Sequence, residues 1–154
     1  MTMDDDLSAV LNENLDGWNR TMGLRFVRAT GHEVVAELAI GPQHHQPYGI
    51  VHGGVYCSVI ETVASVGAGI HALSEGRSVV GLENSTSFLR AAREGKLTIT
   101  ARPLTRGHRT QVWEGVVADV DGKTCATGRV RILCLEPGAA IAGETAEVKA
   151  TKLA

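Results

Sequence analysis

The longest apolar stretch of the chain runs from residue 53 to residue 70 and carries a single charged side chain, Glu61. A helix of this composition is apolar on nearly every side, so the pattern predicts a buried helix over about residues 52–73. Transfer of an ionised carboxylate out of water costs on the order of several kcal/mol unless the group is paired or takes up a proton. Glu61 is therefore paired, neutral or part of a functional site.

The neighbours of Glu61 on such a helix supply no positive charge. Helical spacing places four residues on its face, namely Cys57, Ser58, Ala64 and Ser65. Compensation for the carboxylate must come from a cleft, from water, from a neighbouring strand or from another chain.

Two patterns precede the buried helix. Residues 4–20 begin with aspartates and then repeat apolar side chains at helical spacing, which predicts a short amphipathic helix. Residues 24–29 and 33–40 are extended runs separated by Thr30 and Gly31, which indicates a hairpin. Residues 41–49 contain two prolines and two glycines and form a loop.

After the helix the period changes to that of strands. Extended runs are expected over residues 79–89, 97–102, 110–120 and 124–135, with a two-residue hairpin turn at Asp121 and Gly122. One buried helix followed by antiparallel strands indicates an α+β fold in which the sheet wraps the helix. We therefore expect an N-terminal helix within residues 1–20, a domain over 21–136, and a largely disordered tail over 137–154.

Composition narrows the functional classes. The chain has 154 residues, of which 44% are hydrophobic, enough for one domain with a real core. Fifteen basic and seventeen acidic residues give a net charge of -2, so no footprint for nucleic acid is present. The three cysteines form no closely spaced pair, which favours a reducing compartment, and we expect a cytoplasmic protein.

Three further classes are disfavoured. A membrane span would place Glu61 in mid-bilayer, without clusters of lysine or arginine at its flanks. His44, His45 and His52 match metal-ligand spacing only loosely, so no metal site is expected. The chain also has no Gly-x-Ser-x-Gly nucleophile motif, which argues against a serine-triad hydrolase.

The entry to the predicted helix suits an anion. It consists of His52, Gly53 and Gly54. The first amides of a helix have no intrahelical acceptor, and the helix dipole favours negative charge beside them. This arrangement is suited to stabilising an oxyanion.

Taken together, these motifs resemble those of a known family. The order Gln46, His52-Gly53-Gly54, Glu61 and Ser65 is followed by Val80–Glu83, Arg90–Gly95 and Gln111–Trp113. The chain resembles the hotdog-fold acyl-CoA thioesterases over about residues 18–136. It is most similar to the branch that acts on 4-hydroxybenzoyl-CoA and 1,4-dihydroxy-2-naphthoyl-CoA. The resemblance implies an antiparallel sheet around a long central helix, and an acyl-CoA substrate without metal or organic cofactor.

The resemblance also implies residue roles. Glu61 would attack the thioester carbonyl or activate a water, and the amide of Gly53 would donate to the thioester oxygen. Gln46 would position the substrate, His52 would support the leaving-group side, and Ser65 would orient the carboxylate or its water. Contacts to coenzyme A are implied at Gly54, Arg90, Arg106, His108 and Arg109, where guanidinium groups suit phosphate.

The spacing of Gly53 and Glu61 bears on assembly. Eight residues separate them, about 12 Å along a helix. One thioester carbonyl cannot contact both in one chain. If both act on one substrate, a second subunit must supply Glu61, which predicts a homodimer with shared active sites. The resemblance implies the same, with dimers pairing into tetramers.

Several alternatives remain open. The acyl group is aromatic or bulky by resemblance alone, and fatty acyl-CoA or acyl-carrier-protein thioesters are the first alternative. A non-catalytic acyl-CoA-binding domain is the second. At the level of residues, Cys57 is expected to be a small buried side chain, and Trp18 and Trp113 are expected in the core or an interface.

Overall fold

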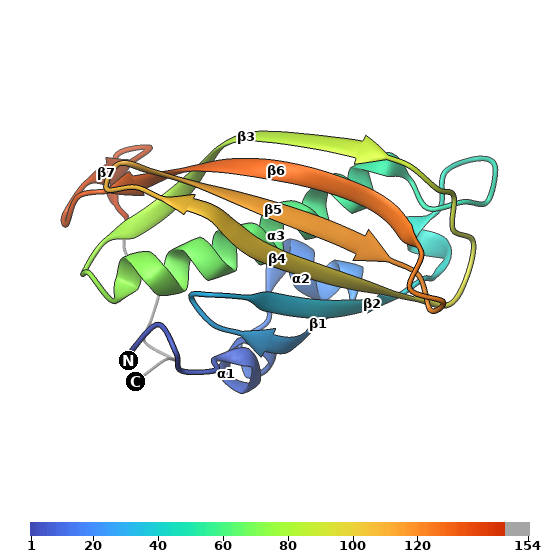
Figure 1. Ribbon diagram of the computed structural model, residues 1–154, viewed down its shortest axis with the longest axis horizontal. Coiled ribbons are helices and arrows are strands. Elements are labelled where there is room, and N and C mark those ends of the chain that lie inside the picture. Colours follow the sequence, from blue (N-terminus) through green and yellow to red (C-terminus); the bar gives the residue numbers. More distant parts are fainter. Residues whose placement is uncertain (147–154) are drawn as a thin grey trace.

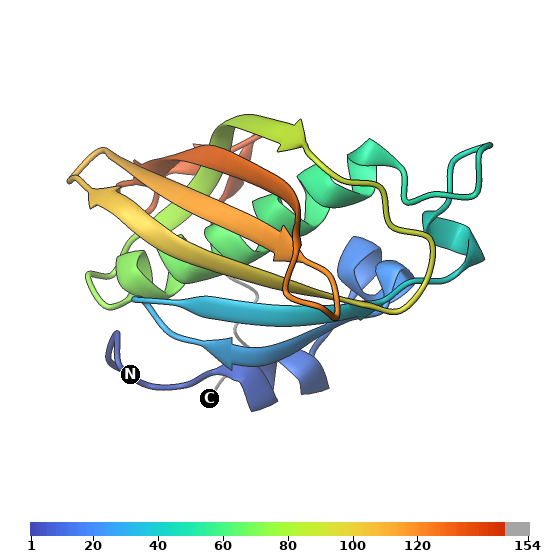
Figure 2. The same ribbon diagram turned by 45° about the vertical axis from the view of Figure 1, so that its right-hand side comes forward.

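The computed structural model describes residues 1–146; the last eight residues lie outside the described part. A six-stranded antiparallel sheet curves around one long helix, α3 (Gly53–Leu73), as Figures 1 and 2 show. The predicted α+β architecture, with a sheet wrapped around a central helix, is confirmed.

The sheet places the strand that follows the helix at one edge. Its strands are β1 (Leu24–Ala29), β2 (Val34–Ala39), β3 (Ser78–Phe88), β4 (Lys96–Arg106), β5 (Thr110–Ala118) and β6 (Thr124–Leu135). Their order is β1-β2-β4-β5-β6-β3, so β1 and β3 are the edges. In β3, Asn84 pairs with Val130 of β6, and the other side of β3 pairs with no described strand.

The alternation of the strands determines which face meets the helix. On β5 every second residue is buried, and Trp113 is fully buried in the core. A Cβ added at Gly67 of α3 would overlap the Trp113 ring, so the helix and strand approach closely there. On the outer face Glu37 pairs with Arg25 and Lys96, which keeps that face polar.

The central helix leaves one face open. Ten of its 21 residues are buried, including Val59, Ile60 and Val63. Its length and hydropathy would suffice to cross a membrane, but these are also the properties of a core helix, and the sheet wraps it here. Glu61 and Ser65 lie on the face that remains half-buried. The chain therefore holds its one charged helix residue at a partly open surface.

The N-terminal segment forms two short helices, where one was predicted. These are α1 (Ser8–Glu13) and α2 (Gly17–Met22). The break lies at Asp16, whose side chain accepts a hydrogen bond from the Gly17 amide at 2.7 Å, and Gly17 has a φ of 53°. A positive φ suits glycine and interrupts helical geometry. Asn12 holds α1 on β1 through two hydrogen bonds to the backbone of Phe26.

Two remaining segments complete the chain. The loop before α3 contains one 3-10 turn, η1 (Pro42–His44). Part of the tail predicted to be disordered is ordered, because β7 (Ala140–Ile141) pairs with β8 (Glu144–Thr145). The Ser78 hydroxyl donates to the carbonyl of Ala146 at 2.7 Å, which fixes this hairpin to the start of β3. The rest of that prediction, for residues 147–154, lies outside the described residues.

Candidate active site

The N-terminus of α3 presents one unused amide. The His52 ring caps the helix, accepting a hydrogen bond at Nδ1 from the Gly54 amide at 2.8 Å. The Val55 amide donates to the His52 carbonyl at 2.9 Å. The Gly53 amide has no partner within residues 1–146. A free amide at a helix N-terminus is a donor for a developing negative charge.

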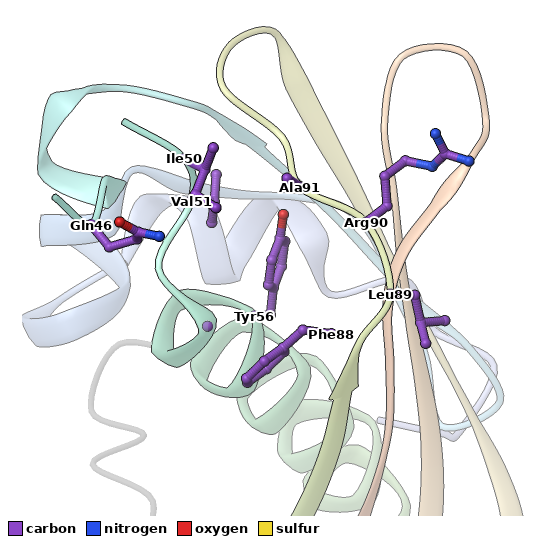
Figure 3. Close-up of a pocket in the computed structure, with 9 residues that line it drawn as sticks. Gln46, Ile50, Val51, Tyr56, Phe88, Leu89, Arg90 and Ala91 are labelled. Carbon is purple, nitrogen blue, oxygen red and sulfur yellow. The ribbon is translucent and has the colours of Figure 1, made fainter. Parts of the chain in front are cut away.

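This amide borders a cavity of about 300 Å³, here called the Gly53 pocket. It is lined by Gln46, Ile50, Val51, Gly53, Tyr56, Phe88, Leu89, Arg90 and Ala91. Figure 3 shows Tyr56 rising from α3 with Phe88 beside it, and Gln46 and Arg90 on opposite sides. A Cβ at Gly53 would lie 2.7 Å from Cζ of Phe88, so the exposed ring would have to shift to admit a side chain there.

Two walls of the Gly53 pocket are fixed by local contacts. The Gln46 side-chain oxygen accepts from the Tyr48 amide, which holds the loop and orients the side-chain amide group. Burial, with a smaller contribution from Cys125, raises the pKa of Tyr56 to about 12, so its phenol stays neutral. The Tyr56 hydroxyl is buried and has no hydrogen-bond partner among the described residues. The pocket therefore combines apolar walls with neutral polar groups and the guanidinium group of Arg90.

Glu61 lies further along α3, and neutral groups donate hydrogen bonds to its carboxylate. Ser65 Oγ donates to Oε1 at 3.4 Å, and Asn84 Nδ2 donates to Oε2 at 3.2 Å. Asn84 Nδ2 also donates to the Cys57 carbonyl at 2.9 Å, and Thr86 Oγ1 donates to Asn84 Oδ1 at 2.6 Å. These bonds fix which end of the Asn84 amide faces Glu61. No cation among the described residues forms an ion pair with the carboxylate.

Glu61 borders a second cavity, of about 400 Å³, here called the Glu61 pocket. It is lined by Leu7, Leu11, Asn19, Glu61, Thr62, Ser65, Val66, Gly69, Ile70, Leu73 and Val79. The two pockets share no lining residue. One chain therefore divides the predicted catalytic residues between two places, with Gln46 and Gly53 in one and Glu61 and Ser65 in the other.

The predicted coenzyme A contacts are also divided. Arg90 lines the Gly53 pocket. Arg106 lies at the other end of the sheet, where Nη1 donates to the Gly31 carbonyl at 2.9 Å. His108 Nδ1 lies 4.0 Å from Glu136 Oε1, and the Arg109 carbonyl accepts from the Cys134 amide at 2.8 Å. These three residues share the turn between β4 and β5, and the described chain does not bring them to Arg90.

Two contacts of Glu61 were not predicted from sequence. Asn84 was not singled out, although its polar side chain lies on the strand beside the buried helix. Gly81 was quoted only within a motif; a Cβ there would overlap Oε1 of Glu61. A lone glycine within a strand pattern often marks a close approach, and that signal was available.

The histidine pair before the helix has a structural role at His44. Its Nδ1 accepts from the Gly41 amide at 2.8 Å, and its Nε2 lies 2.8 Å from the Met22 carbonyl. Both ring nitrogens are thus occupied by the backbone. Within the described residues, no group of three or more histidine, cysteine, aspartate or glutamate side chains is placed to hold a metal ion.

Comparison with known proteins identifies the family. The family model described as the thioesterase superfamily matches residues 48–126. The Rv1847 protein of Mycobacterium tuberculosis is 38% identical over 133 residues, which are 85% of this chain and 94% of that protein. The proofreading thioesterase EntH of Cronobacter turicensis is 34% identical over 109 residues, which are 71% of this chain and 79% of that protein.

Solved structures agree with these relatives. The Rv1847 structure superposes with a TM-score of 0.76 at 40% identity, covering 77% of this chain and 96% of that one. Thioesterase HI1161 of Haemophilus influenzae gives a TM-score of 0.77 at 26% identity, covering 88% of this chain and 92% of that one. The resemblance inferred from the motifs is confirmed. The chain belongs to the thioesterase superfamily, and it is a thioester hydrolase.

Proposed function

We propose that the protein hydrolyses an acyl-CoA thioester with an aromatic or other bulky acyl group, using Glu61 and the Gly53 amide. The observation that carries the proposal is that α3 presents both a carboxylate held only by neutral donors and an unused amide at its N-terminus. The first is suited to a nucleophile or general base, the second to an oxyanion. The relatives named thioesterases agree with this chemistry.

The chemical steps follow from those two groups. The thioester oxygen accepts a hydrogen bond from the Gly53 amide, where the positive end of the helix dipole favours the charge that develops. Glu61 then either attacks the carbonyl carbon or removes a proton from an attacking water. The carbon–sulfur bond breaks, coenzyme A leaves as the thiol, and one water is consumed to give the free acid. Gln46 and His52 border the carbonyl and leaving-group side, and Ser65 orients the carboxylate.

The proposed active unit is a two-fold dimer. Gly53 and Glu61 lie about 12 Å apart along one helix and in separate pockets, so one carbonyl needs Gly53 of one subunit and the partner subunit's Glu61. The midpoint between them is Cys57, whose carbonyl is bonded to Asn84 at the open edge of β3. An axis near Asn84 would pair the two β3 strands. That edge carries three exposed apolar side chains, Leu82, Phe88 and Leu89.

The same axis gives an account of the divided coenzyme A contacts. Rotation about Asn84 in an antiparallel pair of β3 strands sets Arg90 opposite the partner subunit's Ser78. Ser78 pairs with Leu135 beside the end of the sheet that carries Arg106, His108 and Arg109. Arg90 of one subunit and that turn of the other would then border one phosphate-binding region, with Gly54 near its inner end.

Tetramer formation and the cellular location of the protein are each proposed from a single observation. Pairing of dimers into tetramers rests on the family resemblance. A cytoplasmic location rests on the free thiols of Cys57, Cys125 and Cys134, which suit a reducing compartment.

The size of the Glu61 pocket keeps one alternative substrate class open. Its volume of about 400 Å³ exceeds the ~150 Å³ cavity that accepts benzene. A fused ring system or an aliphatic chain would fill it better than a single ring. Fatty acyl-CoA and carrier-protein thioesters are therefore the second candidate. A domain that only binds acyl-CoA has no use for a carboxylate held by neutral donors.

The proposal is tested by thiol release from a panel of benzoyl-, hydroxybenzoyl-, dihydroxynaphthoyl-, hexanoyl- and palmitoyl-CoA. We expect Glu61→Gln to lower kcat by roughly a thousandfold or more, because the carboxylate acts in the reaction. The matched control is Glu114→Gln on the outer face of the sheet, where Glu114 pairs with Arg129. It should retain activity. Near-normal turnover by a folded Glu61→Gln protein would remove the central role of this residue.

A further inference from the structure

The Glu61 pocket has a polar end and an apolar end. Glu61, Thr62 and Ser65 border the part nearest the N-terminal half of α3. From there Val66, Ile70 and Leu73 continue the wall along the helix, over a length of about 18 Å between residues 61 and 73. An acyl group whose carbonyl lies beside Glu61 would extend along this apolar wall, with its first atoms at the polar end.

Asn19 of α2 closes the polar end. Thr62 Oγ1 donates to Asn19 Oδ1 at 3.0 Å, which ties α2 to the residue that follows Glu61. The backbone of Asn19 is also fixed, because its carbonyl accepts from the amide of Gly23 at the end of α2. The side chain is half-buried and lines the pocket. Its position is therefore set by contacts on two sides.

The free group of Asn19 is a hydrogen-bond donor. Its Oδ1 is occupied by Thr62, and its Nδ2 has no protein partner within residues 1–146. The other polar side chains of the pocket already donate, since Ser65 donates to Glu61 and Thr62 donates to Asn19. Asn19 Nδ2 thus supplies the uncommitted donor at the polar end of an otherwise apolar cavity. A donor in that setting favours a ligand that offers an acceptor at the same place.

We propose that Asn19 is a specificity-determining residue, which selects acyl groups that carry a hydroxyl or other acceptor close to the thioester carbonyl and an apolar body beyond it. This inference rests on the proposed function, because it places the acyl group in the Glu61 pocket. A site built to bond a substrate hydroxyl rejects the analogue that lacks it more strongly than an apolar pocket rejects an extra hydroxyl. Since Asn19 is only half-buried, we expect a preference of roughly tenfold.

The test compares matched substrates that differ by one hydroxyl. The pairs are ortho-hydroxybenzoyl-CoA with benzoyl-CoA, and β-hydroxyoctanoyl-CoA with octanoyl-CoA. For each pair the ratio of kcat/KM values is measured in the unmodified protein and in Asn19→Leu, which removes the donor at similar size. We expect at least one pair to show the roughly tenfold preference, and Asn19→Leu to bring its ratio close to one.

A control separates recognition from damage to the N-terminal helices. Asn14→Leu makes the same substitution at the end of α1, where Asn14 Nδ2 donates to the Val10 carbonyl and does not line the pocket. It should keep the preference of the unmodified protein. The role of Asn19 is overturned if the ratio of kcat/KM values is the same in Asn19→Leu as in the unmodified protein. It is also overturned if the unmodified protein shows no preference in either pair. Neither result affects Glu61-dependent hydrolysis. Loss of Glu61-dependent hydrolysis for every substrate overturns the proposed function, and this inference with it.

Discussion

The position of the Glu61 carboxylate depends on its hydrogen bonds and on the absence of a side chain at Gly81. Gly81 of β3 faces the carboxylate, and any Cβ at that position would overlap Oε1. Asn84, three residues along the same strand, donates to the other oxygen. The strand therefore holds the carboxylate from one side with an amide and leaves space for it on the other.

Gly81→Ala should impair catalysis more than stability. The added methyl meets the end of a flexible side chain, which can move away at small cost, but the move takes Glu61 from Ser65 and Asn84. We expect kcat to fall by roughly tenfold to a hundredfold, with a thermal midpoint close to that of the unmodified protein. Both are measured on the same preparation.

The contrasting control is Gly67→Ala. Its methyl would overlap the buried ring of Trp113, which has no free space to move into. Overpacking of this kind costs about 1–3 kcal/mol, partly offset by the better helix propensity of alanine. The thermal midpoint should fall while the folded protein keeps its activity. The interpretation of Gly81 fails if its alanine variant instead loses stability and keeps kcat.

At the residue scale, the sequence indicated candidates where their chemistry is distinctive. The lone carboxylate in an apolar helix and the glycines at the helix start singled out Glu61 and Gly53 directly. Asn84 and Asn19 were not found, because nothing in a strand or a short helix indicates which polar side chain will face a residue distant in sequence. Their contacts with Thr62 and Glu61 arise only once β3 and α2 pack beside α3.

At the scale of elements, the far end of α3 carries a pH-sensitive contact. His71 Nδ1 lies 3.4 Å from Gln111 Nε2. The other atom of that amide group, Gln111 Oε1, accepts a hydrogen bond from the Trp113 indole. The Gln111 amide can donate to the ring only while Nδ1 is unprotonated. Burial lowers the pKa of His71 below its ordinary value of 6.5; Arg106, Arg77 and His32 lower it further, and Glu75 opposes them.

This contact predicts a loss of stability in mild acid. The pKa of His71 is lowered on folding, so the unfolded chain binds the proton first and protonation favours unfolding. The contribution is fully present above about pH 6.5 and is lost as the pH falls from there through the lowered pKa of the folded state. Denaturant midpoints measured from about pH 7.5 to about pH 5 should therefore fall less for His71→Gln than for the unmodified protein. An identical pH dependence of the two proteins would rule out this role of His71.

Most elements were predictable because their patterns are local. The period of the apolar residues gave α3 and every long strand of the sheet. The break between α1 and α2 was missed, because Asp16 and Gly17 interrupt the helix through one capping bond and one positive φ without disturbing the apolar spacing. The hairpin of β7 and β8 was missed for a different reason: its residues are exposed, so no apolar pattern indicates it.

At the scale of the whole molecule, one chain places the two proposed catalytic groups in separate pockets. The Gly53 pocket contains the amide donor and Gln46, while the Glu61 pocket contains the carboxylate. Sequence spacing already indicated this separation, because eight residues of helix span about 12 Å. The exposed edge of β3, with its apolar side chains, is where a second copy would join them. If two copies share the site, the acyl group that fits depends on the packing between them, and no pattern in a single sequence gives that packing.

Shared sites predict that two inactive variants restore activity when mixed. In a heterodimer of Gln46→Ala and Glu61→Ala, one site combines the intact Gln46 of the second variant with the intact Glu61 of the first. The other site carries both changes. Random assembly gives about half heterodimers, each with one working site, so refolding an equal mixture should recover about a quarter of the unmodified activity.

Each variant refolded alone, and the two refolded separately and then combined without exchange, serve as controls. If each active site lay within one chain, both sites of the heterodimer would remain defective and the refolded mixture would only average the two variants. Recovery well above that average requires that Gln46 of one subunit and Glu61 of the other act in the same active site. Pairing of a second copy at the open β3 edge would then complete the active sites, and it would also bury Leu82, Phe88 and Leu89.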